Sequence, residues 1–202
     1  IDQLLTENAQ SAAQAEIYRT EYDVLLDSLE RSDLTVAITG NKATGKTTLL
    51  THLQAAESPT VTFNVSFCDA DLVLLMIAGD MTASELNRLE TLISDGHQVL
   101  MVLNKQDQYT PMDKAVVLDR INQHVAERGV DVVAIAANPN PIKVRRHTES
   151  GDITEFLEQP EADVDPLTQT LDGFTADPTP LVKATPQRQT KAQQQTNIQT
   201  HN

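Results

Sequence analysis

The chain has 202 residues, a formal net charge of −14 and a single cysteine, Cys68. This length suits one domain with a sizeable core plus a tail. The strongly acidic balance argues against nucleic acid as a partner. One cysteine excludes an internal disulfide, which fits a reducing compartment, so we expect a cytoplasmic protein. No stretch reaches the roughly 18–20 apolar residues that a membrane helix needs, and no signal peptide is visible.

The first 31 residues form a separate segment. Tyr18, Tyr22, Leu25 and Leu29 recur at intervals of four, three and four residues, which places them on one face of a helix. The spacing predicts an N-terminal helix over residues 1–31 that packs on the edge of the domain. One heptad-like stretch is too short to indicate a coiled coil.

Residues 40–47, Gly-Asn-Lys-Ala-Thr-Gly-Lys-Thr, match the phosphate-binding P-loop pattern G-x-x-x-x-G-K-[ST]. The β-branched run 34–39 before them predicts a buried strand, and residues 48–56 after them predict a helix. Glycines at both ends let the backbone aim its N–H groups inward as an anion-binding nest. We assign phosphate binding to Gly40, Asn41, Lys42, Ala43, Thr44, Gly45, Lys46, Thr47 and Thr48.

Two side chains of this loop carry the expected chemistry. Lys46 is placed to neutralise the β- and γ-phosphates, and the Thr47 hydroxyl to bind Mg²⁺, which keeps most of its other ligands as water and phosphate oxygen. We therefore expect Lys46 and Thr47 to be the catalytic residues. The positive end of the following helix adds to the attraction for phosphate.

Strands and helices then alternate along the chain. Residues 60–67 alternate by two and predict a half-buried strand, while runs 72–78, 99–103 and 130–136 predict buried strands. A capping box at Thr82-Ala83-Ser84-Glu85 opens a helix that ends at Gly96, and Thr110-Pro111 opens another that ends at Gly129. This order predicts an α/β fold with a mainly parallel sheet.

Beyond residue 141 the pattern changes. Residues 142–157 contain a turn signal between two short apolar runs and predict a small peripheral hairpin, and Pro166 begins a terminal helix. From Asp177 the sequence is rich in Pro, Thr and Gln. We expect residues 176–202 to be a disordered tail.

A second motif, Asn104-Lys105-Gln106-Asp107, follows the strand 99–103 and fits N-K-x-D. Together with the P-loop it resembles the translation-factor-related GTPases, whose two motifs both lie at carboxyl ends of parallel strands, where ligands of such sheets bind. The resemblance implies that Asp107 accepts two N–H bonds from guanine. It also implies that Asn104 holds the loop, that the Lys105 stem covers the ring, and that the backbone N–H of Ala137 meets the guanine oxygen.

More narrowly, Ala70-Asp71-Leu72-Val73-Leu74-Leu75 followed by Gly79-Asp80 resembles Era-like GTPases, in particular cyanobacterial ones whose GTPase domain precedes a membrane-associated helical region. The resemblance covers residues 33–140. It implies a three-layer P-loop NTPase fold, with a GTPase domain at residues 32–175, GTP or GDP and Mg²⁺ as cofactors, and a protein effector or activator. It also implies a peripheral place at a membrane through such a region, which we do not find in residues 1–202.

The sequence departs from these GTPases between the first helix and Leu72. Residues 57–71 hold no D-x-x-G motif and are too few for two full switch loops, so we expect a shortened switch region. Asp69 is a candidate for the aspartate that supports Mg²⁺. The alternative is that Asp69 and Asp71 are ordinary turn carboxylates. With no glutamine placed to orient the attacking water, we expect slow hydrolysis.

Three functions stay open at this point. The first is a guanine-nucleotide-binding regulatory protein with weak GTPase activity. The second is a non-catalytic pseudo-GTPase that works as an interaction module. The third is a P-loop ATPase or kinase, against which the N-K-x-D motif argues, because adenine lacks the donor pair that Asp107 would accept.

Overall fold

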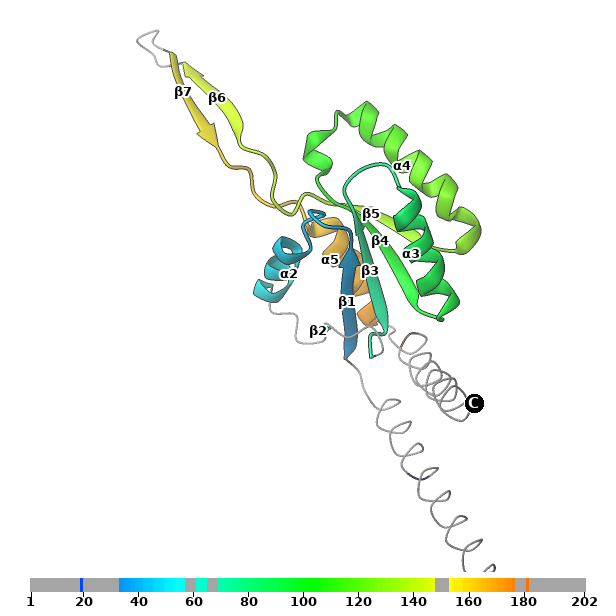
Figure 1. Ribbon diagram of the computed structural model, residues 1–202. Coiled ribbons are helices and arrows are strands. Elements are labelled where there is room, and N and C mark those ends of the chain that lie inside the picture. Colours follow the sequence, from blue (N-terminus) through cyan, green and yellow to red (C-terminus); the bar gives the residue numbers. More distant parts are fainter. Residues whose placement is uncertain are drawn as a thin grey trace, which may run out of the picture.

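The computed structural model describes residues 19, 33–56, 61–64, 69–147, 153–176 and 181 (Figure 1). Its centre is a five-stranded sheet in the order β2-β1-β3-β4-β5, and every pairing in it is parallel. The strands are β1 (Leu34–Gly40), β2 (Val61–Asn64), β3 (Leu72–Ile77), β4 (Gln98–Leu103) and β5 (Asp131–Ala134). The expected parallel α/β sheet is confirmed.

Four helices cover the two faces of this sheet. Helices α2 (Lys46–Ala55) and α5 (Asp165–Ala176) lie on one face, and α3 (Ala83–Ser94) and α4 (Pro111–Val125) lie on the other (Figure 1). Two short 3₁₀ turns, η1 (Gln106–Gln108) and η2 (Ala126–Arg128), follow β4 and α4. The result is the three-layer arrangement of a P-loop NTPase fold.

The central strand β3 shows why the sheet needs helices on both faces. All six of its residues are fully buried, because alternate side chains enter different cores. Leu72, Leu74 and Met76 pack with α2 and α5, whereas Val73, Leu75 and Ile77 pack with α3 and α4. A continuous apolar run is the pattern expected of such a strand.

The helix starts follow the predicted capping residues. The Thr82 side chain accepts from the Glu85 N–H, and the Glu85 carboxylate accepts from the Thr82 N–H, which completes the capping box. At the start of α4, Thr110 accepts from the Asp113 N–H, and Pro111 occupies the first turn. These caps fix where both helices leave the upper edge of the sheet.

The edge strand β2 lies within the predicted strand 60–67. It spans Val61–Asn64 and pairs with β1 alone among the described strands, Leu34 opposite Val61. Residues 57–60 and 65–68 of the predicted strand and its flanks lie outside the described residues. Residues 56–71 are all that connects α2 to β3, the strand that pairs with β1 on its other side.

The two ends of the chain are mostly outside the described residues. The predicted N-terminal helix over 1–31 contributes only Arg19, which is helical. Of the predicted disordered tail over residues 176–202, the structure describes Ala176, which belongs to α5, and Leu181, which is buried in the core with α5 residues. The rest of this tail lies outside the described residues, so its disorder stays a prediction. No helix among the described residues is long and apolar enough to cross a bilayer.

Gly173 offers a test of this fold that does not touch the site. It lies within α5, and a Cβ added there would meet no heavy atom within 4 Å. Glycine in a helix costs about 0.5–1 kcal/mol relative to alanine, because its backbone loses more freedom on folding. We expect Gly173→Ala to raise the free energy of unfolding by that amount in urea denaturation. A lower value would place Gly173 outside a helix.

Candidate functional site

The P-loop leaves the carboxyl end of β1 and turns sharply into α2. Three residues of this turn have a positive φ, namely Gly40 (145°), Ala43 (65°) and Gly45 (91°), and the last two have left-handed backbone. A Cβ on Gly40 would collide with the Met76 carbonyl of the neighbouring strand. Helix α2 starts directly after Gly45, so its first N–H groups have no partner within the helix. Backbone of this kind forms an anion-binding nest.

Lys46 and Thr47, to which the sequence assigns the phosphate and Mg²⁺ chemistry, open helix α2. The Lys46 ammonium donates to the carbonyls of Gly40 (3.0 Å) and Asn41 (2.6 Å), which holds it against the first residues of the loop. Thr47, in the first turn of α2, is exposed. The loop is braced from within by Thr44, whose hydroxyl donates to the Asn41 carbonyl at 3.0 Å.

Asn104 joins three segments that are far apart in the sequence. Its side chain is buried, 3% exposed. The Nδ2 atom donates to the Thr44 carbonyl of the P-loop at 2.9 Å, and Oδ1 accepts the Ala137 backbone N–H at 3.0 Å. The P-loop, the N-K-x-D loop and the segment after β5 therefore meet at one amide.

The other residues of the N-K-x-D loop lie at the same edge of the sheet. Lys105 has a left-handed backbone (φ 63°), which turns the chain after β4. Asp107 is exposed, and its Oδ2 accepts the Asn140 N–H at 2.9 Å. The sequence predicted that Asn104, Asp107 and Ala137 would lie near the P-loop, and the structure brings them together.

Helix α3 also reaches the P-loop, which the sequence did not indicate. The Asn41 amide donates to the Ser84 hydroxyl at 3.4 Å, and the Arg88 guanidinium donates to the Thr39 hydroxyl at 3.0 Å. Both contacts join residues more than 40 positions apart, so no local pattern reveals them. They anchor the end of β1 and the start of the P-loop to the first turns of α3.

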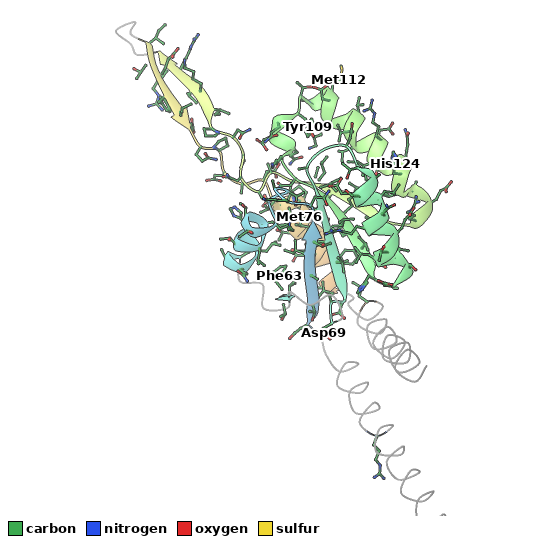
Figure 2. All side chains as sticks on the ribbon, in the orientation of Figure 1. Phe63, Asp69, Met76, Tyr109, Met112 and His124 are labelled. Carbon is green, nitrogen blue, oxygen red and sulfur yellow. The ribbon has the colours of Figure 1, made fainter. Side chains whose placement is uncertain are left out.

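Asp69 does not lie with the other candidate residues, and its assignment to a metal site is wrong. It comes just before Asp71, whose backbone N–H donates to the Thr35 carbonyl at 2.8 Å near the start of β1. The P-loop follows the opposite end of β1, and Figure 2 shows Asp69 at the lower edge, away from Met76 and Tyr109. The chain enters β3 at that lower edge because β3 runs parallel to β1.

Asp71 fills the structural role that the alternative assigned to these carboxylates. Its Oδ2 accepts the Thr35 N–H at 2.8 Å, and the side chain is 1% exposed. Within the described ranges, no three His, Cys, Asp or Glu side chains gather as a metal site. Thr47 remains the one predicted metal-binding residue that lies beside the P-loop.

A further set of contacts ties the N-K-x-D loop to the base of the hairpin β6–β7. The Gln106 amide donates to Asp163 at 2.6 Å, and the Gln159 amide donates to the Pro139 carbonyl at 2.6 Å. A cavity of about 380 Å³ lies here, lined by Asp107, Lys114 and Pro141 among others. Both ends of the hairpin are thus fixed beside Asp107.

Gly45 provides a stability test of the site. A Cβ there would collide with the Asn104 amide nitrogen, and the residue has φ 91°. Left-handed backbone costs an alanine about 1–2 kcal/mol and overpacking about 1–3 kcal/mol more. We expect Gly45→Ala to lower the free energy of unfolding by about 2–5 kcal/mol, measured in urea.

Gly129 is the matched control for that substitution. It has φ 63°, but nothing lies within 4 Å of an added Cβ. Gly129→Ala should therefore cost only the backbone part, about 1–2 kcal/mol. Equal losses for the two variants would mean that Gly45 and Asn104 are not in close contact.

The chain was also compared with known proteins. No family model and no curated protein matches the chain. Among solved structures it is similar to the bacterial selenocysteine-specific elongation factor EF-Sec, at 13% identity and a TM-score of 0.42, over 52% of this chain and 26% of that one. It is also similar to translation elongation factor SelB from Methanococcus maripaludis in its apo form, at 15% identity and a TM-score of 0.44, over 52% and 29%. The chain thus spans less than a third of either elongation factor.

Proposed function

We propose that this protein binds GTP and GDP with Mg²⁺, hydrolyses GTP slowly and acts as a regulatory protein. One observation carries the proposal. The buried Asn104 amide bonds both the Thr44 carbonyl and the Ala137 N–H, so the segments that would hold the phosphates and the base are fixed at one edge of the sheet. Ligands of open α/β sheets bind at that edge.

The P-loop residues fit a di- or triphosphate. The left-handed residues Ala43 and Gly45 and the start of α2 direct backbone N–H groups toward one point. Lys46 already lies against the loop and would exchange its carbonyl partners for phosphate oxygens. The Thr47 hydroxyl would take one position on Mg²⁺.

The second loop fits guanine rather than adenine. Guanine presents a ring N–H and an amino group side by side, and a carboxylate such as Asp107 can accept from both. The Ala137 N–H, which the resemblance assigned to the guanine oxygen, donates instead to Asn104 Oδ1 at 3.0 Å. It therefore supports the loop, and Asp107 is the residue that we propose contacts the base. Adenine would leave the Asp107 carboxylate unpaired against the base, which is costly when water is excluded.

Slow hydrolysis follows from what this sequence lacks around the phosphates. No D-x-x-G motif occurs anywhere in the 202 residues, and Asp69 lies at the opposite edge of the sheet. Phosphoryl transfer depends on groups that position the attacking water and stabilise charge. A protein activator that supplies such groups is part of this proposal.

Calorimetric titration of the whole chain with GDP and ADP in Mg²⁺ tests the proposal. We expect GDP to bind and ADP to bind at least about 100-fold more weakly, because a site built on hydrogen bonds rejects analogues that lack them. Lys46→Ala should weaken GDP binding at least about tenfold through the lost charge-assisted contacts. Lys143→Ala, on the hairpin, is the matched control and should leave binding unchanged.

The same titration separates the alternatives. Equal affinity for ADP and GDP would favour a P-loop ATPase or kinase. Absence of binding to either nucleotide would favour a non-catalytic interaction module. If GDP binds, single-turnover hydrolysis of GTP with and without Lys46→Ala then measures how much catalysis this chain supplies by itself.

A further inference from the structure

The hairpin formed by β6 (Ile142–His147) and β7 (Ile153–Glu158) extends away from the three-layer domain (Figure 1). Within the described residues its strands pair only with each other. A two-stranded hairpin by itself is marginally stable in water. Both of its outer edges therefore present backbone groups that another strand can use.

Apolar side chains concentrate on this hairpin. Of the six exposed large hydrophobic residues among the described ones, four lie here, namely Ile142 (53% exposed), Ile153 (59%), Phe156 (36%) and Leu157 (72%). Exposed apolar groups gathered on one element mark an interaction surface rather than ordinary scatter.

The register of the hairpin separates its two faces. Ile142, Val144 and Phe156 share one face, since Val144 lies opposite Phe156, and the Arg146 guanidinium covers the Phe156 ring at 5.4 Å. On the other face, Lys143 and Arg145 both pair with Glu155. Along β6, the apolar Ile142 and Val144 therefore point to one face and the basic Lys143 and Arg145 to the other. On β7, Phe156 shares the face of Ile142 and Val144, whereas Leu157 lies opposite Lys143 on the basic face.

Charge decides which partner fits the outer edge of β6. This strand holds Lys143, Arg145 and Arg146 and no acidic residue, in a chain of net charge −14. Two copies of β6 side by side would place like charges opposite each other, which is unfavourable. An acidic strand would instead complete the ion pairing of Lys143 and Arg145, which are 58% and 66% exposed.

We propose that the outer edge of β6 binds an extended segment of another protein in which acidic and apolar residues alternate. The segment adds a third strand to the hairpin through backbone hydrogen bonds. Its apolar side chains extend the Ile142–Val144–Phe156 face, and its carboxylates meet Lys143 and Arg145 on the other. An anionic membrane fits less well, because the sequence between the strands contains Glu149 and Asp152.

A synthetic peptide of alternating Glu and Val, labelled for fluorescence anisotropy, tests this docking on the full chain. We expect it to bind at least about tenfold more tightly than a peptide of alternating Lys and Val. A third peptide, N-methylated at every residue, has no backbone N–H left on either edge, so it cannot pair as a strand and should lose at least about tenfold in affinity. Unchanged binding of the N-methylated peptide would overturn strand addition.

Variants locate the binding to this edge. Arg145→Glu should lower the affinity for the Glu–Val peptide at least about tenfold and raise the affinity for the Lys–Val peptide. Arg120→Glu is the matched control on α4, where Arg120 is 61% exposed and pairs with Asp80, and it should change neither. Equal effects of the two variants would overturn the proposal.

Two other classes of partner are outcomes of the same experiment. If Arg145→Glu abolished binding to phosphatidylglycerol vesicles or to a single-stranded RNA 20-mer, while no peptide bound, the protein partner would be excluded. The docking proposal does not depend on nucleotide binding. GDP titration of the Arg145→Glu variant keeps the two questions apart, because we expect GDP to bind it as it binds the unaltered chain.

Discussion

Asn104→Ala should unfold at markedly lower denaturant concentration and lose guanine-nucleotide binding. The substitution leaves the Thr44 carbonyl and the Ala137 N–H, which both bond the Asn104 amide, without partners in the interior. Each unpaired buried group costs about 1–3 kcal/mol. For the two groups together we expect a loss of about 2–6 kcal/mol in the free energy of unfolding, measured in urea, and at least about a 100-fold loss in GDP affinity by calorimetry.

Asn122→Ala is the control for this result. Asn122 is exposed on α4, and a surface substitution there should change stability by no more than about 0.5 kcal/mol. If Asn104→Ala were as stable as this control and still bound GDP, the amide would not be what holds the two loops together.

Asp107→Asn should change which purine the protein prefers. The carboxylate can accept two N–H bonds from guanine, whereas an asparagine can accept one and donate one. Xanthine carries a carbonyl where guanine carries the amino group, so it matches asparagine. We expect GDP affinity to fall at least about 100-fold and xanthosine diphosphate to bind more tightly than GDP, since sites that rely on hydrogen bonds discriminate strongly.

Asp113→Asn provides the comparison for Asp107→Asn. Asp113 is an exposed carboxylate in the first turn of α4, near in sequence but outside the N-K-x-D loop. We expect it to leave the GDP preference unchanged. Unaltered preference in Asp107→Asn as well would show that Asp107 does not contact the base.

Much of this fold could be predicted from the sequence because its signals are local. The buried run of β3, the capping box at Thr82 and the Thr110-Pro111 helix start each depend on neighbours within a few positions. The pairing of β2 could not be predicted in this way. A period of two extends through residues 60–67, of which the described residues Val61–Asn64 pair in parallel with β1. Pairing is a tertiary event that alternation does not specify.

In the candidate site, too, the residues in local motifs could be predicted from the sequence, whereas the contacts between distant segments could not. The P-loop and N-K-x-D residues were found because fixed spacings follow strands, and parallel strands bring their ends to one edge. Asp69 was misplaced because the sequence does not say at which edge a short connection lies. The Arg88–Thr39 and Gln106–Asp163 contacts join distant segments through single hydrogen bonds, which leave no periodic signal.

The base of the hairpin is joined by hydrogen bonds to the N-K-x-D loop, where we propose that the purine binds. The Asn140 N–H, just before β6 begins, donates to Asp107, and the Gln106 amide donates to Asp163 soon after β7 ends. Both ends of the hairpin are therefore bonded to the loop that carries Asp107. Guanine that recruits the Asp107 oxygens competes with Asn140 for the same lone pairs. If nucleotide binding changes the affinity of the hairpin for a partner by some factor, that partner must change the affinity for nucleotide by the same factor, because linkage between two binding sites is reciprocal.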